Sequence, residues 1–262
     1  EQNSIVDSKG FRRLEFSSSP EIYDNSLQAW FKDMTNYDLS LMHFLFGAGA
    51  EMANELGIKT EAAHWNKLKS QLPDFDLDNE GSLTFAKGFP YNASHRHFSH
   101  ALAIHPLGII DWSDGEKAQR IIRATLKKMN DYGPDYWTGY TYSWFANMQA
   151  RAFNGEEAAK ALRTFAECFC LKNTFHANVD QSASGKSKFT YRPFTLEGNF
   201  AFAAGIHEML LQSHTGVIRV FPAVLESWKN VSFNNLRAMG GFLVSAALKD
   251  GKVVRLEIYA EK

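Results

Sequence analysis

The densest cluster of side chains that could do chemistry is the run Ser94-His95-Arg96-His97-Phe98-Ser99-His100. His97 and His100 could share one face of a helix, but no nearby carboxylate or cysteine completes a set of metal ligands. We therefore predict neither a metal site nor a cofactor here. Two interpretations remain open: satisfied histidines at a helix start, or a neutral-sugar site in which Arg96 and His97 bind hydroxyl groups. Arginine is a permanent donor for such groups, whereas histidine can donate or accept.

Two glutamates on separate loops could supply acid–base chemistry. Glu21 follows Ser19-Pro20 and precedes an aromatic-rich segment, and Glu197 stands at the mouth of the last predicted helix. Paired carboxyl groups are typical of glycoside hydrolysis, in which one protonates the leaving oxygen and the other helps to activate water. Each also has an ordinary interpretation, because a loop glutamate is often a solvated surface charge and the helix macrodipole favours an acidic first turn. Spacing alone does not show that the two converge.

A third candidate lies in the aromatic segment 138–144. Tyr140 stands near the loop and is predicted to line a cleft, because the apolar faces of sugar rings pack on flat aromatic surfaces. Trp144 is expected in the core, and His207 and His214 are interpreted as structural.

These candidates must be positioned by a chain that is predicted to be mainly helical. The spacing of apolar residues predicts about seven helices, over residues 36–56, 60–72, 97–104, 116–132, 142–153, 156–170 and 199–213. Residues 74–94 are predicted to form a long loop, and loops of this length are usually functional. Paired antiparallel helices joined by loops suggest a helical toroid.

The apolar period changes from residue 217 onward. Strands are predicted over 217–221, 242–248 and 253–259, and a turn at 249–252 joins the last two as a hairpin. The predicted fold is therefore mainly α, with helical hairpins in residues 1–215 and a small antiparallel β module in residues 216–262.

Composition excludes several classes of protein. The 262 residues are 45% hydrophobic, which is ordinary for a globular protein with a sizeable core. A formal net charge of -1 argues against a protein that binds nucleic acid or an anionic membrane. No stretch approaches the ~20 apolar residues that cross a bilayer. The first residues, Glu1-Gln2-Asn3, show no signal peptide.

In their order along the chain, these stretches resemble glycoside hydrolase family 95, the α-L-fucosidase family with an (α/α)6 catalytic barrel. Ser19-Pro20-Glu21 looks like the family's Ser-Pro-Glu loop, and residues 95–100 look like its His-Arg-His-x-Ser-His motif. Residues 139–151 are similar to its Gly-Trp-Ser-x-x-Trp helix with the following Asn and Ala-Arg. Residues 197–214 resemble its Asp-Gly-Asn-Phe helix almost throughout, and the likeness continues into residues 222–242.

The resemblance implies part of an (α/α)6 toroid and an inverting hydrolysis of terminal α-L-fucosyl or α-L-galactosyl residues of an oligosaccharide or glycan. By this carry-over Glu21 is the general acid, and Arg96 and His97 contact the sugar. Glu197 supports a water-activating asparagine in the same comparison. The resemblance also implies a secreted, periplasmic or cell-surface protein that needs no cofactor.

Two departures from the family pattern matter. Glu197 stands where the family has Asp, which moves the carboxylate by about an ångström, and misplacement on that scale can cost roughly 100-fold in rate. Tyr140 stands where the family has Trp. The family's water-activating asparagines precede its Ser-Pro-Glu loop, and the residues before Ser17 cannot supply them. We therefore expect the C-terminal part of a catalytic barrel that is silent without an N-terminal remainder. The alternatives are a non-catalytic carbohydrate-binding relative and a toroid of another class, such as a polysaccharide lyase.

Overall fold

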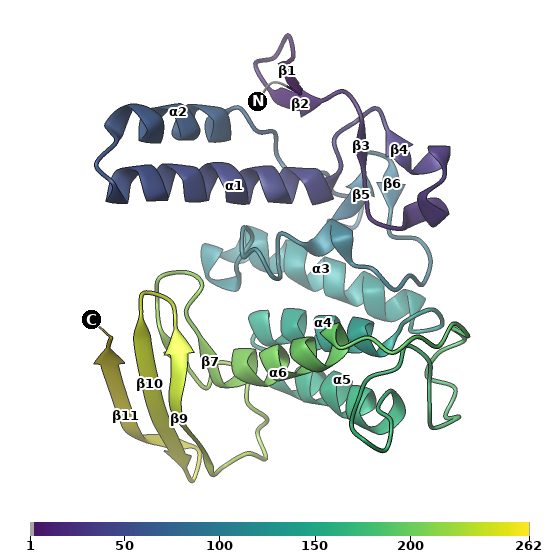
Figure 1. Cartoon of the computed structure of the whole chain (residues 1–262), viewed down its shortest axis with the longest axis vertical. Coiled ribbons are helices and arrows are strands. Elements are labelled where there is room, and N and C mark those ends of the chain that lie inside the picture. Colours follow the sequence, from purple (N-terminus) through teal and green to yellow (C-terminus); the bar gives the residue numbers. More distant parts are fainter. Residues whose placement is uncertain (1–2, 262) are drawn as a thin grey trace. The chain divides into compact units, whose positions relative to one another are not determined.

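The computed structural model describes residues 3–261, which form two compact units (Figure 1). The first unit holds the residues up to 93, residues 97–110 and residues 116–132, and the second holds residues 94–96, 111–115 and those from 133 onward. The chain thus passes repeatedly from one unit to the other. Each unit is described by itself below.

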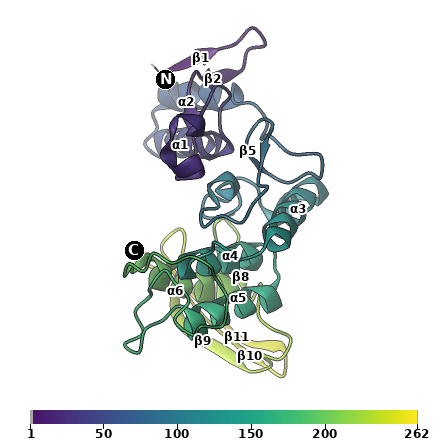
Figure 2. The ribbon, with the colours of Figure 1, turned by 90° about the vertical axis from the view of Figure 1, so that its right-hand side faces the viewer.

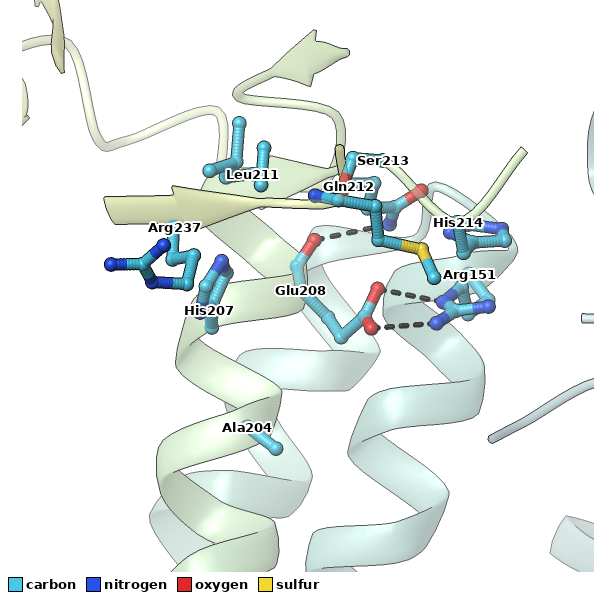
Figure 3. Close-up of a pocket in the computed structure, with 11 residues that line it drawn as sticks. Arg151, Ala204, His207, Glu208, Leu211, Gln212, Ser213, His214 and Arg237 are labelled. Atoms are coloured by element: carbon cyan, nitrogen blue, oxygen red, sulfur yellow. Dashed lines mark hydrogen bonds and ion pairs between the residues drawn. The ribbon is translucent and has the colours of Figure 1, made fainter. Parts of the chain in front are cut away.

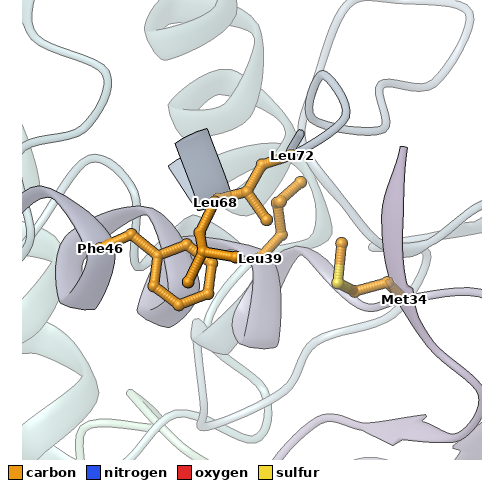
Figure 4. Packing of buried hydrophobic residues seen from close by; sticks show 5 residues of the cluster. All are labelled: Met34, Leu39, Phe46, Leu68 and Leu72. Atoms are coloured by element: carbon orange, nitrogen blue, oxygen red, sulfur yellow. The ribbon is translucent and has the colours of Figure 1, made fainter. Parts of the chain in front are cut away.

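The first unit is built on a helical hairpin, α1 (Asn36–Glu55) and α2 (Lys59–Ser70). Thr35 caps α1, because its side chain accepts a hydrogen bond from the Asp38 N–H group. Gly57, with a φ of 71°, turns the chain between the helices. Apolar side chains of both helices and of the residues that flank them meet in a buried cluster (Figure 4), which consists of Met34, Leu39, Phe46, Leu68 and Leu72. Both predicted helices are confirmed.

The same unit contains α3 (Glu116–Tyr132) and three pairs of short antiparallel strands. The pairs are β1 (Ser4–Val6) with β2 (Arg12–Leu14), β3 (Ser17–Ser18) with β4 (Trp30–Phe31), and β5 (Thr84–Ala86) with β6 (Phe89–Pro90). The last pair lies within the predicted loop 74–94. Strands of two or three residues are too short to show an alternating pattern, which explains why the sequence did not predict them.

The predicted short helix over residues 97–104 is wrong. This part of the chain forms a single 3₁₀ turn, η3 (Ser99–Ala101), followed by further turns. Phe98 and His100 are both fully buried here, so tertiary packing on two sides replaces the one-sided burial of a surface helix. Further 3₁₀ turns are η1 (Ile22–Asn25), η2 (Leu27–Ala29) and η4 (Trp112–Asp114).

The second unit is centred on α4 (Gly139–Arg151), which packs against both α5 (Gly155–Cys168) and α6 (Glu197–Leu210). Every residue of α4 except Tyr140 is buried. A Cβ atom on Gly205 of α6 would lie 3.0 Å from a Leu162 methyl group and 3.3 Å from the Asn147 amide nitrogen, so the helices approach closely there. The helix predicted to reach residue 213 ends at Leu210, where the chain becomes extended.

The β module completes the second unit. β7 (Leu211–Gln212) pairs with β8 (Arg219–Val220). An antiparallel sheet is formed by β9 (Val231–Ala238), β10 (Phe242–Lys249) and β11 (Lys252–Ala260) in the order β11-β10-β9 (Figure 1). Figure 2 shows the same strands from a second side. Lys249 pairs with Lys252, which confirms the predicted hairpin. β9 was not predicted from the sequence, because its alternation is broken at Asn235, where φ is 53° and the register with β10 shifts.

The described residues thus form six α-helices, not about seven, followed by small antiparallel sheets. The prediction of a mainly helical part followed by a β module is confirmed. In residues 3–261, every helix is too short or too polar to span a bilayer.

Candidate active site

The loop between β3 and β4 holds Glu21 in a left-handed backbone conformation, with a φ of 56° and a ψ of 11°. Tyr23, Asp24 and Asn25 also have positive φ values, of 48°, 51° and 57°. Each such residue costs roughly 1 kcal/mol or more when it is not glycine, and strain of this kind clusters at functional sites. The Asn25 side chain accepts a hydrogen bond from the Glu21 N–H group at 3.0 Å and helps to hold this turn.

Buried hydroxyl groups fix the start of the loop. The Oγ atoms of Ser19 and Ser99 lie 2.6 Å apart, and both residues are buried. Ser17 Oγ accepts from the Thr35 N–H group at 2.9 Å and donates to Asp38 at 2.5 Å. The segment that leads into Glu21 is therefore anchored both to the first turn of α1 and to η3.

Glu21 is paired with His97. The Oε2 atom of Glu21 lies 3.0 Å from Nε2 of His97, and the two side chains are 41% and 27% exposed. The imidazole can either donate to the carboxylate or accept a hydrogen bond from the protonated carboxyl group. The structure thus brings the predicted acid to one of the predicted sugar-contacting residues, and a ligand could reach both.

His100 does not take part in this arrangement. It is completely buried, and its ring lies 4.8 Å from Phe85, 5.0 Å from Tyr91 and 6.4 Å from Phe98, measured between ring centroids. Among the residues that the structure describes, no three His, Cys, Asp or Glu side chains gather to hold a metal ion. His100 belongs to an aromatic core, while His97 faces Glu21.

The first turn of α4 positions Arg96 and Tyr140. Thr138 caps this helix, and its N–H group donates to Thr141 Oγ1 at 3.0 Å in a reciprocal capping box. The hydroxyl of Thr141 in turn donates to the backbone oxygen of Arg96 at 2.8 Å. The guanidinium carbon of Arg96 lies 5.3 Å above the centroid of the Phe189 ring, a cation–π contact.

Tyr140 is electrostatically linked to Glu197. Its half-buried ring packs on the buried Trp144, with centroids 5.6 Å apart. Burial raises the pKa of the Tyr140 phenol, and the negative charge of Glu197 raises it further. The phenol therefore remains a neutral hydrogen-bond donor. Glu197 is exposed in the first turn of α6, where the helix macrodipole favours a negative charge.

His176, which lies between the first turns of α4 and α6, was not among the residues predicted from the sequence. It is fully buried, and a Cβ atom on either Gly139 or Gly198 would lie 2.5 Å from its imidazole ring. The available signal was the pair of glycines at two helix starts. Glycine is a poor helix former, so its presence there indicates a close approach of another group.

The predicted site residues therefore fall into two groups. Glu21 and His97 form a pair in the first unit, whereas Arg96, Tyr140 and Glu197 surround the first turns of α4 and α6 in the second. The boundary between the units passes between Arg96 and His97, which are consecutive in the chain.

A cavity of about 450 Å³ lies at the other end of α6 (Figure 3). Its lining includes Arg151 and Glu208, whose side chains form a two-pronged ion pair at 2.6 and 2.7 Å. It also includes His207 and His214, and Nε2 of His214 lies 2.6 Å from the Asp111 carboxylate. None of the predicted site residues lines this cavity.

Comparison with known proteins gives matches along nearly the whole chain. Residues 3–210 match the sequence model of the glycosyl hydrolase family 95 catalytic domain, and residues 212–262 match that of the glycoside hydrolase family 95 C-terminal domain. The chain is 31% identical over 232 residues to alpha-L-fucosidase 2 of Arabidopsis thaliana. This alignment covers 86% of the chain but only 27% of the length of that relative.

Proposed function

Because this chain belongs to glycoside hydrolase family 95, we propose that it is part of an inverting exo-glycosidase that removes terminal α-L-fucosyl or α-L-galactosyl residues from oligosaccharides or glycans. In this proposal residues 1–215 form the C-terminal portion of an (α/α)6 catalytic toroid, and residues 216–262 form its β module. The remaining helices come from an N-terminal remainder of the same polypeptide, since the chain spans 27% of the fucosidase relative. The proposed enzyme is secreted, periplasmic or cell-surface and uses no cofactor.

The proposed acid is Glu21, and its pairing with His97 at 3.0 Å is the observation that carries the proposal. Glu21 gives its proton to the glycosidic oxygen as the bond from that oxygen to the anomeric carbon breaks, and the bonding electrons stay on the leaving oxygen. Water attacks the anomeric carbon from the opposite face and loses a proton to a base, which inverts the configuration. His97 accepts a hydrogen bond from the protonated carboxyl group and so orients it.

The second group of residues has binding and supporting roles in this proposal. Arg96, with its permanent charge, and Tyr140, with a neutral phenol, donate hydrogen bonds to sugar hydroxyl groups. The Tyr140 ring also offers an apolar surface to the sugar. Glu197 supports the side-chain amide of an asparagine that positions the attacking water, and the N-terminal remainder supplies this asparagine. Membership of the family and the fucosidase relative favour this enzyme over a non-catalytic binding protein.

Substitution Glu21→Gln in the full-length protein tests the acid directly. We expect kcat/KM on a fucosyl or galactosyl disaccharide and on a weakly activated aryl glycoside to fall by about 100-fold or more, because the leaving oxygen is no longer protonated. With a highly activated aryl leaving group the loss should be smaller, since such a group departs without a proton. Steady-state kinetics on the two substrate classes make the measurement.

The matched control is Glu15→Gln, which changes an exposed glutamate a few residues earlier in the chain and should leave kcat/KM unchanged. Near-normal activity of Glu21→Gln on every substrate that the wild type cleaves would remove Glu21 as the acid. A wild-type protein inactive on all fucosyl and galactosyl substrates would overturn the proposed function itself.

A further inference from the structure

His176 fills a slot between two helix starts. Its Cδ2 and Nε2 atoms would lie 2.5 Å from a Cβ on Gly139, and its Nδ1 atom would lie 2.5 Å from a Cβ on Gly198. Gly139 begins the first turn of α4, and Gly198 lies in the first turn of α6. The imidazole therefore contacts the backbone of both helices, and only the lack of a side chain at the two glycines leaves room for it.

Hydrogen bonds fix the ring and its backbone in this slot. Nδ1 lies 2.8 Å from the backbone oxygen of Thr195, and because a carbonyl oxygen can only accept, Nδ1 carries the proton. The Thr195 hydroxyl, also 2.8 Å from Nδ1, donates its own proton to Asn178. The His176 N–H group donates to Asn199 of α6 at 2.9 Å. The residue is thus tied to α6 and to the segment before it.

The charge state agrees with a packing role. Burial lowers the pKa of His176. A hydrogen bond to Thr195 and the charge of Glu197 act in the opposite direction but do not outweigh burial. A positively charged imidazolium between two helix N-termini would also be repelled by the positive ends of the helix dipoles. His176 is therefore a neutral ring near pH 7, and its Nε2 atom has no hydrogen-bond partner among the described residues.

The residues next to the two glycines are candidates for the reaction. Tyr140 follows Gly139, and Glu197 precedes Gly198. Two hydrogen bonds also join the helices: Ser143, one turn into α4, donates to the Gly198 oxygen at 3.2 Å, and Asn147 donates to the Ala201 oxygen at 2.9 Å. They act from the α4 turns that follow Gly139, whereas the imidazole ring lies against both glycines themselves.

We propose that His176 is a positioning residue whose ring sets the spacing between the first turns of α4 and α6, and thereby between Tyr140 and Glu197. The catalytic consequence rests on the proposed function. A change of about 1 Å in the placement of a catalytic group can cost roughly 100-fold in rate. A displacement by the thickness of one aromatic ring is therefore enough to make the placement of Tyr140 and Glu197 unproductive.

A double-mutant cycle in the full-length protein tests this spacing. Gly198→Ala adds a methyl group that pushes the helix starts apart, and His176→Ala removes the ring that separates them. We expect each single variant to lower kcat and kcat/KM by about 100-fold with KM within about threefold, because Glu197 acts in the chemical step. In the double variant the added methyl group occupies part of the emptied slot, so the losses should not multiply and activity should recover by about tenfold over either single variant.

Gly205→Ala is the matched control. It adds a methyl group at another close contact of α6, against Leu162 and Asn147, away from the helix starts. It should lower the melting temperature while kcat stays within about threefold of the wild type. Should His176→Ala not fold, His176→Asn, which keeps an N–H group directed at Thr195, takes its place in the cycle with the same expected non-additivity.

Folded His176 variants with wild-type kcat, or single losses that simply multiply in the double variant, would overturn the proposal. The same cycle is measured in the free energy of unfolding by urea, which needs no substrate. Additive unfolding energies would show that the ring does not set the spacing, even if the wild type proved inactive on every sugar. The failure of this inference and that of the proposed function are therefore separable.

Discussion

Glu197 is exposed in the first turn of α6, and its charge acts on two neighbouring side chains. Burial raises the pKa of Tyr140 and the charge of Glu197 adds to that rise, whereas burial lowers the pKa of His176 and the charge of Glu197 only opposes that fall. Its side chain is one methylene longer than the aspartate found in the family pattern that it resembles. Because Tyr140 also departs from that pattern, the two differences occur together at the same helix starts. We infer that this part of the site is adapted to the longer side chain.

Substitution of Glu197 tests that adaptation. Glu197→Gln removes the charge and Glu197→Asp withdraws the carboxylate by about an ångström, so each should lower kcat by about 100-fold with little change in KM. Steady-state kinetics of the full-length protein provide the measurement, with Glu167→Gln on the exposed face of α5 as the control. A higher kcat for Glu197→Asp would contradict the adaptation.

The sequence indicated candidate residues far better than it indicated their partners. Residue type and local context were enough to single out Glu21 and His97, but their 3.0 Å contact joins positions 76 residues apart (97 - 21) and depends on the folded loops. His176 has no distinctive local context, since it stands in an irregular segment between α5 and α6. Its significance comes from Gly139 and Gly198, which only the fold brings to it.

At the scale of elements, the first turn of α4 links helix formation to the proposed sugar-binding residues Arg96 and Tyr140. The sequence predicted the helix from residue 142, whereas it begins at Gly139. Glycine is unfavourable in a helix, so the apolar pattern alone places the start too late. In the structure this preference is offset by the capping box of Thr138 and Thr141 and by the packing of Gly139 on His176. Long helices with regular apolar spacing were predicted well, including the capped start of α1, but the start of α4 and the end of α6 were misplaced.

Thr141→Val tests the link between this turn and Arg96. The variant keeps the side-chain shape but loses the bond to the Arg96 oxygen and the bond from the Thr138 N–H group. We expect it to cost about 1–3 kcal/mol in unfolding free energy, because a partly buried acceptor loses its donor and a buried donor loses its acceptor. The freed Arg96 backbone should also raise KM by about tenfold, which corresponds to 1.4 kcal/mol.

Thr138→Ala separates the two effects. It removes the cap at a cost of about 1 kcal/mol but leaves the bond from Thr141 to Arg96 in place, so KM should stay near the wild-type value. Urea unfolding and steady-state kinetics on both variants make the comparison. An equal rise in KM for both would mean that Arg96 is not held through Thr141.

At the scale of the whole molecule, contacts between distant parts of the sequence decide which unit a segment joins. Residues 111–115 belong to the second unit although the residues on either side belong to the first. The contact between Asp111 and His214, whose side chains are only 5% and 11% exposed, ties this short segment to the chain just after β7. Helical and strand patterns are local, so they could predict the helical part and the β module but not this interleaved path of the chain.

Asp111→Asn should destabilise the protein and change its response to acid. Burial alone would raise the pKa of Asp111, but hydrogen bonds from His214 and Ser113 outweigh it and hold the pKa well below its usual value. The pair therefore stabilises the fold fully at pH values above the pKa of about 4 that Asp111 has in the unfolded state. This stability is lost as the pH falls toward and through the lower pKa of Asp111 in the folded protein, because the unfolded state binds the proton first.

Urea unfolding at pH 7 and at pH 3 measures both effects. We expect Asp111→Asn to cost about 3 kcal/mol at pH 7 and to show a weaker dependence on pH below 4 than the wild type. Asp131→Asn, which removes an exposed partner of Lys127, should have no measurable effect. Equal stability of the Asp111 variant and the wild type at pH 7 would contradict this role.

The slot that holds His176 also limits how this protein can change over generations. A side chain larger than hydrogen at position 139 or 198 collides with the ring, and a smaller residue at position 176 leaves a void. Either change is harmful alone. A smaller residue at 176 combined with alanine at position 198 restores much of the contact, whereas a Cβ atom at position 139 would still lie 2.6 Å from the Cβ atom of Phe169. Drift at positions 176 and 198 should therefore be correlated, although the two are far from adjacent in the chain.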